Sequence, residues 1–122
     1  MALTHQTAIR NGIANYVTGE IDTGGAGTLQ FQTSGDVECA TVTFSATAFT
    51  GAAGGVDTAD TITSDTSATG GDVTKFRIFN GSATEIMDGN VQTSGGDINL
   101  SSLSVGVGDT VSMSSLTYTA PV

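Results

Sequence analysis

From residue 28 onward, apolar side chains alternate with polar ones at a period of two. Leu29 and Phe31 alternate with glutamines, and residues 39–44 alternate between apolar side chains and threonines. Successive side chains of a strand point to opposite faces, so this pattern predicts strands with one buried and one solvated face. The turn residues 34–36 stand between the two runs, and the whole segment is therefore predicted to be a β-hairpin.

The same alternation continues from residue 73 in short runs that are separated by turn residues. Asn80-Gly81 is a preferred pair for a type I′ hairpin turn, and Asp88-Gly89 predicts a further turn. In the last run, residues 111–120, the apolar parity shifts by one residue, which predicts a β-bulge at Ser114-Ser115. About seven to eight short strands at this spacing predict an antiparallel β-sandwich or jelly roll over residues 28–122.

A helical period occurs only at the N-terminus. Apolar residues recur there at spacings of three and four, in one stripe formed by Ala8, Ile9, Ile13, Tyr16 and Val17. The stripe predicts one short N-terminal α-helix within residues 1–19, followed by a Gly-rich connector over residues 20–27. With the β-region, these segments make a single predicted domain of residues 1–122.

The predicted helix has visible start and stop signals and one weak point. Thr4 is the expected N-cap, and Gly19 stands where a helix commonly stops. Gly12 in its middle costs about 1 kcal/mol relative to Ala, so we expect the helix to be stable only if its stripe is buried. A break into two pieces at Asn11-Gly12 is the alternative.

The charge balance disfavours two classes of partner. The formal net charge is −9, and Lys75 and Arg77 are the only cations near each other in the sequence. Nucleic acids and anionic membrane surfaces both require clustered cations, so we expect neither as a partner. The first ten residues resemble no secretory signal, and no apolar run approaches a membrane span. We therefore expect synthesis in the cytoplasm without a signal peptide.

Residues that carry catalysis are scarce. The chain has one histidine, His5, and one cysteine, Cys39, which lies in the middle of a predicted strand and is expected to be a buried, inert thiol. A nucleophile needs a base within hydrogen-bond reach, and one histidine on the N-terminal turn does not provide a triad. We therefore expect no enzymatic activity, no catalytic residues and no cofactor.

The least periodic stretch is the loop of residues 46–72. Residues 51–55 predict a flexible segment with Phe49 and Val56 as its anchors, and residues 61–63 predict a short edge strand. Asp57, Asp60 and Asp65 offer three oxygen ligands for calcium, but isolated loop carboxylates more often cap turns or remain solvated. We favour the solvated carboxylates and predict no metal site.

Several segments of the chain follow one another in an order that resembles a known group of proteins. The segments are residues 8–15, 25–28, 29–31, 40–44, 62–68 and 93–100. Their order resembles that of small Gly/Ser/Thr-rich virion-associated structural proteins of tailed bacteriophages. The resemblance implies a non-enzymatic virion component made in the host cytoplasm, most simply a capsid decoration (cement) protein bound to the major capsid protein. It carries over no active-site residues.

Two sets of residues are candidates for docking or self-association. The first is Ile9, Ile13, Tyr16 and Val17, and the second is Phe49 and Val56. The alternative for the first set is packing against the chain's own sheet. A homo-oligomer is expected, with a trimer preferred because closed rings add buried area for small subunits. A small tail, neck or fibre protein is the second functional hypothesis, and a carbohydrate-binding β-module is the third.

Overall fold

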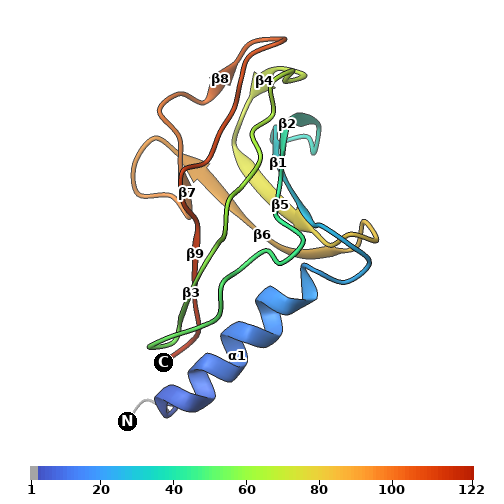
Figure 1. Ribbon diagram of the computed structural model, residues 1–122. Helices are drawn as coiled ribbons and strands as arrows, with labels where there is room; N and C mark the ends of the chain where they lie inside the picture. Colours follow the sequence, from blue (N-terminus) through green and yellow to red (C-terminus); the bar gives the residue numbers. More distant parts are fainter. Residues whose placement is uncertain (1–2) are drawn as a thin grey trace.

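The computed structural model describes residues 3–122 and shows a mainly β protein with one short N-terminal helix (Figure 1). Helix α1 spans Thr7–Glu20 and is followed, along the described residues, by nine short strands. Their bounds are β1 (Thr28–Gln32), β2 (Glu38–Thr43), β3 (Val56–Thr58), β4 (Gly71–Asp72), β5 (Lys75–Phe79), β6 (Glu85–Gln92), β7 (Ile98–Asn99), β8 (Ser104–Val105) and β9 (Thr117–Thr119).

The strands form one curled five-stranded sheet and two small ribbons. The sheet has the order β2-β1-β5-β6-β7, and the ribbons pair β3 with β9 and β4 with β8. All pairs are antiparallel except β6 and β7, which run parallel after the short loop 93–97. The predicted β class with one short helix is confirmed, whereas a purely antiparallel arrangement is not found. The second layer of a sandwich or jelly roll stays a prediction.

The period-two pattern places the core on one face of β1, β2 and β5. Two cross-strand rows bring apolar side chains together at the centre of the sheet, and every member is at most 5% exposed. The rows are Val42–Leu29–Ile78 and Ala40–Phe31–Phe76. Fully burying one large apolar side chain contributes roughly 1.5–3 kcal/mol, so these rows are the main stabilising element of the sheet.

The hairpin between β5 and β6 forms as predicted, but its turn type is different. The Asn80 N–H donates to the Thr84 carbonyl at 2.9 Å, and Ala83, with φ of 62°, holds the left-handed conformation instead of Asn80 or Gly81. The Asn80 side-chain oxygen accepts hydrogen bonds from the N–H groups of Ser82 and Thr84, both at 2.9 Å. Asn80 therefore organises a longer loop, and the predicted type I′ turn at Asn80-Gly81 is wrong.

The predicted turn at Asp88-Gly89 is also wrong, because both residues lie inside strand β6. Gly89 pairs with Phe76 of β5, and a Cβ atom at this position would stand 2.6 Å from Cε1 of the Phe76 ring. Glycine is required here by the close approach of an aromatic ring across the strands, not by a turn.

Of two other predicted strands, one is reduced to a single bridge and the other is shortened. Residues 61–63 contribute one bridge, Thr43 to Thr63, and the predicted run 111–120 contributes the bridge Asp65 to Val111 before β9 begins at Thr117. The parity shift at Ser114-Ser115 therefore lies in a segment without strand pairing, and no bulge forms there. Ser and Thr tolerate the extended conformation but bury little apolar surface, so these segments extend without forming full ladders.

Helix α1 differs from the prediction at both ends. It begins after Gln6, which makes no side-chain cap, so Thr4 is not the N-cap, and it continues through Gly12 and past Gly19 without a break. Residues 1–2 of the predicted helical segment, residues 1–19, lie outside the described residues. α1 packs chiefly along β3 and β9, and the chain ends near its first turn (Figure 1). In the part of the chain that the structure describes, no helix is long and apolar enough to cross a membrane.

Candidate functional site

The face of α1 that packs on the protein is largely polar. Ala14 and Thr18 are its two buried residues, at 0% and 4% exposure. The Thr18 hydroxyl lies 2.7 Å from Oδ2 of Asp57, a β3 carboxylate that is only 1% exposed, and Asp57 Oδ1 accepts a hydrogen bond from the Gly51 N–H at 2.9 Å. The buried carboxylate of Asp57 thus links the helix, strand β3 and the loop of residues 51–55.

Two asparagines extend this attachment along the helix. The side-chain oxygen of Asn11 accepts a hydrogen bond from the Gly55 N–H at 2.8 Å, and that of Asn15 accepts one from the Ala52 N–H at 2.8 Å. Because amide and carboxylate oxygens satisfy its backbone N–H groups, the loop of residues 51–55 is held against α1. The segment that was predicted to be flexible is therefore, in this structure, a loop that is hydrogen-bonded to the helix.

Arg10 completes the polar face at the N-terminal end of the helix. Its guanidinium donates to the carbonyl oxygens of Ala120, Pro121 and Gly54 at 3.1, 3.3 and 3.4 Å. It also lies close over Gly55, where a Cβ atom would stand 2.5 Å from the guanidinium carbon. Arg10 therefore ties α1 to the C-terminal segment and to the loop of residues 51–55. We call Arg10, Asn11, Ala14, Asn15 and Thr18 the inner face of α1.

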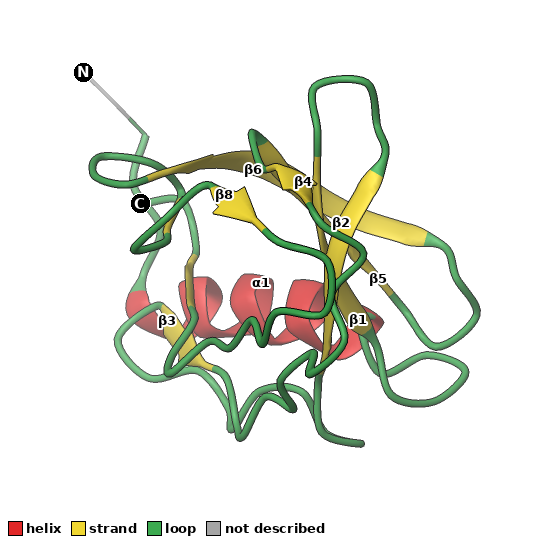
Figure 2. Cartoon of the chain, turned by 90° about the horizontal axis from the view of Figure 1, so that it is seen from above, coloured by secondary structure: helices red, strands yellow, loops and turns green. Residues whose placement is uncertain are grey.

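The apolar stripe of the helix points the other way. Ile9 and Tyr16 are 56% and 70% exposed, Ile13 is half-buried, and a Cβ atom on Gly12 would meet open space. We call these four residues the outer face of α1; Val17, also half-buried, lies at its margin. Figure 2 shows α1 lying alongside strand β3, against which the helix packs. Packing of this stripe on the chain's own sheet is therefore ruled out for Ile9 and Tyr16.

The second predicted docking pair does not join this surface. Phe49 is 6% exposed and belongs to the core, where its ring centroid lies 5.9 Å from that of Phe44. Val56 is half-buried in β3 and exchanges backbone hydrogen bonds with Ala53. Phe49 anchors the loop as predicted, but its side chain is not available to a partner in this structure.

The three loop aspartates are separated by the fold. Asp57 bonds Thr18 and Gly51, as described above, Asp60 accepts a hydrogen bond from the Thr61 N–H, and Asp65 accepts one from the Thr41 N–H. Within residues 3–122, no group of three His, Cys, Asp or Glu side chains is arranged to hold a metal ion. The hypothesis of a three-ligand calcium site is therefore wrong. Asp57, however, is buried and not solvated as favoured.

The remaining reactive and cationic side chains are those of Cys39, Lys75 and Arg77. Each is either buried or paired with a carboxylate. Burial raises the pKa of the Cys39 thiol, with smaller contributions from the negative charges of Glu38 and Asp72. Lys75 forms an ion pair with Asp36 on the polar face of the sheet. Arg77 lies 3.4 Å from Asp36 and 3.1 Å from Glu85, so both clustered cations already have carboxylate partners.

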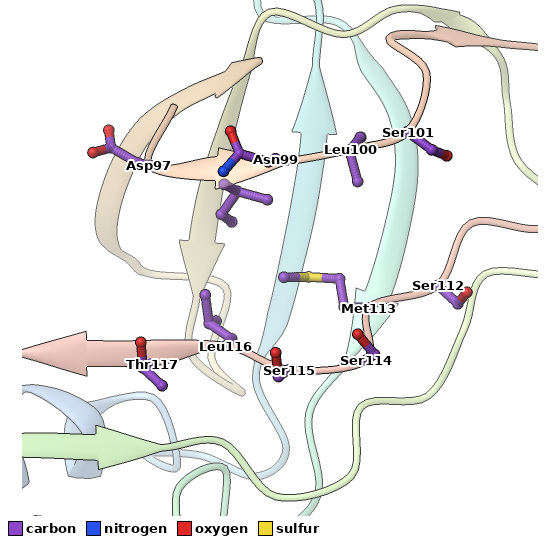
Figure 3. A pocket seen from close by; sticks show the side chains of 11 residues that line it. Asp97, Asn99, Leu100, Ser101, Ser112, Met113, Ser114, Ser115, Leu116 and Thr117 are labelled. Atoms are coloured by element: carbon purple, nitrogen blue, oxygen red, sulfur yellow. The ribbon is translucent and has the colours of Figure 1, made fainter. Parts of the chain in front are cut away.

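A separate cleft of about 390 Å³ opens beside strand β7 (Figure 3). Residues 97–101 form one wall and residues 112–117 form the other, and the two segments run in opposite directions with the Met113 side chain between them (Figure 3). The sequence pattern does not predict this cleft, although the serines of both walls are plain in the sequence, at positions 101, 112, 114 and 115.

Comparison of the chain with protein families, with curated proteins and with solved structures finds no match. The outer face of α1 and the cleft beside β7 are therefore judged on their geometry alone. Of the two, only the outer face contains residues that the sequence predicts for docking.

Proposed function

We propose that this chain is a non-enzymatic structural protein of a tailed-phage virion, and that it binds the outer shell as a capsid decoration (cement) protein. The observation that carries the proposal is the orientation of α1. The helix attaches to its own chain through polar side chains and leaves Ile9 and Tyr16 exposed on its outer face.

The energetics of this arrangement favour a partner on the outer face. Burial of apolar surface contributes roughly 25 cal/mol per Å², and the free chain does not gain this contribution from exposed Ile9 and Tyr16. At 1.5 Å per residue the 14-residue helix is roughly 21 Å long, which suits a groove or ridge on a larger surface. A partner that covers the outer face would therefore gain the free energy of burying Ile9 and Tyr16, which the monomer does not gain.

Two further exposed apolar residues lie near the N-terminal end of α1. Leu3 and Val122 are 91% and 68% exposed, and His5 Nδ1 lies 3.2 Å from the Val122 carbonyl, which places the C-terminus at this end. A stable interface buries roughly 800 Å² per partner, more than one short helix face supplies. We therefore include Leu3 and Val122 in the proposed contact.

The net charge defines the partner further. A chain with a net charge of −9 is repelled by acidic surfaces and is steered toward basic ones. We propose that the major capsid protein presents an apolar strip with a basic rim to α1. We also propose a trimeric arrangement on the shell, and a thin β-sandwich in which the five-stranded sheet and the β3–β9 ribbon are the two layers.

The test is the location and copy number of the chain in purified particles of the phage that encodes it. Quantitative mass spectrometry is expected to find hundreds of copies per particle, and electron microscopy is expected to place them on the shell. A dozen copies or fewer would indicate the tail or neck instead. Absence of the chain from particles would overturn the proposal altogether.

A further inference from the structure

The cleft beside β7 is one end of a longer groove. A second cavity of about 210 Å³ lies next to the first, and the two share Leu100, Ser101 and Ser112 in their linings. Asp97 lines the first cavity and Asp109 lines the second, and we treat the two adjoining cavities as one groove. We call this surface the β7 groove.

One wall of the groove is a free sheet edge. β7 is the last strand of the five-stranded sheet and, among the described residues, pairs only with β6, where the Leu100 N–H donates to the Gln92 carbonyl at 2.9 Å. Backbone groups of a strand alternate in direction, so those of Asn99, next to Leu100, face away from β6. This wall therefore presents hydrogen-bonding groups that an added strand can use.

The opposite wall has unused backbone donors. Val111 exchanges both of its backbone hydrogen bonds with Asp65, which is not among the residues that line the groove. Among the residues that the structure describes, no acceptor receives a hydrogen bond from the N–H groups of residues 112–116. Exposed backbone groups of this kind pair with water in the free chain and are available to a bound peptide backbone.

The side chains specify what kind of peptide suits the groove. Ile98 is 5% exposed, and half-buried Leu100, Met113 and Leu116 make an apolar floor beneath the serine-rich rim. Of the described residues that line the groove, only Asp97 in the first cavity and Asp109 in the second are charged, and each accepts one backbone hydrogen bond. Within residues 3–122, neither carboxylate has a cation within ion-pair distance.

We propose that the β7 groove binds an extended segment of a different polypeptide, with an apolar residue over the floor and a lysine or arginine toward each end. Main-chain hydrogen bonds to both walls would supply affinity, and the two aspartates would select cationic ends. A second copy of this chain is a poor occupant, because its three cations, Arg10, Lys75 and Arg77, are already bonded. This inference is independent of the proposed virion role.

The test uses the full chain and a capped peptide of sequence Lys-Thr-Val-Thr-Val-Thr-Lys. In an NMR titration we expect shift changes and slower amide exchange at residues 98–101 and 112–116. A peptide with glutamate at both ends and one with alternate N-methylated residues are both expected to bind at least tenfold more weakly. Because only the ligand changes, misfolding of a variant cannot explain either result.

Protein variants provide the complementary test. The double variant Asp97→Asn/Asp109→Asn keeps an oxygen acceptor at each position and is expected to bind the lysine peptide about fivefold more weakly. Asp60→Asn is the matched control, because Asp60 also caps a backbone N–H but lies outside the groove, and it is expected to bind normally. No binding at millimolar peptide, equal binding of the N-methylated peptide, or shift changes centred on α1 would overturn the inference.

Discussion

The five-stranded sheet and helix α1 are held in this molecule by opposite kinds of interaction. The sheet buries apolar rows such as Leu29–Ile78 on its inner face and leaves charged residues outside. α1 turns hydrogen-bonding side chains such as Asn11 and Thr18 inward and leaves apolar residues outside. In the described part of the chain, the apolar core cluster takes no member from α1.

This contrast separates two uses of apolar residues in a chain that has few of them. Gly, Ser and Thr make up 50 of the 122 residues, so each exposed apolar side chain is a loss to a small core. The sheet uses its apolar residues for folding. The outer face of α1 contributes nothing comparable to the free monomer, and we infer that it is kept for association.

The largest effect on stability is expected at the centre of the sheet. Phe31 is fully buried, so Phe31→Ala should lower the free energy of unfolding by about 3–5 kcal/mol through lost burial and a new cavity. Phe31→Leu, which leaves a smaller cavity, should cost clearly less. Chemical denaturation measures both. A loss below 1 kcal/mol for the alanine variant would show that the sheet is not the main source of stability.

A smaller effect is expected at the polar attachment of α1. Asp57→Ala leaves the Gly51 N–H without its buried acceptor and should lower the free energy of unfolding by about 1–3 kcal/mol. Asp57→Asn should cost less. The side-chain amide at position 57 in this variant can donate to the Thr18 oxygen, while the Thr18 hydroxyl donates to the Ala14 carbonyl. In the wild-type structure that hydroxyl oxygen and that carbonyl oxygen are 3.0 Å apart.

Hydrogen exchange shows which part of the molecule is destabilised in the Asp57 variants. In Asp57→Ala the amides of α1 should exchange faster while those of β1 and β5 keep their protection, because the bond lost belongs to the helix attachment. Equal loss of protection in helix and sheet would contradict a separate attachment of α1.

The smallest effect is a dependence of stability on alkaline pH. The pKa of the Cys39 thiol is raised in the folded chain, mainly by burial, so the thiolate forms more easily in the unfolded chain. The thiol's contribution to stability is therefore complete below the unfolded pKa and is lost as the pH rises through the folded pKa. Thermal melts above pH 8 should show this decline in the wild type and a smaller one in Cys39→Ala. Equal declines would contradict it.

The sequence predicted the sheet better than the rest of the molecule. The strands β1, β2 and β5 follow from period-two alternation, because the buried face of a strand repeats at every second residue. Strand β6 was predicted only in part, because a turn was expected in its middle. Gly89 misled the prediction, since Asp-Gly is a turn signal and the close approach of the Phe76 ring is a tertiary fact. The parallel pair β6–β7 has no local signature at all.

The stripe of α1 was predictable, but the direction in which it faces was not. Periodicity shows that one side of a helix is apolar, and the usual expectation is that this side packs on the core. Here the bonding partners of Arg10 and Asn11 are backbone groups of Ala120, Pro121, Gly54 and Gly55. Backbone groups are identical at every residue, so the sequence gives no sign that a Gly-rich loop attracts the polar side of a helix.

The central claim, that the outer face of α1 serves a partner, is tested most directly by co-sedimentation with phage particles lacking the chain. The double variant Ile9→Ser/Tyr16→Ser changes only exposed side chains, so it should fold like the wild type and bind the particles at least tenfold more weakly. Val37→Ser, also at an exposed valine but in the β1–β2 turn, should bind normally. Wild-type binding by the double variant would contradict the claim.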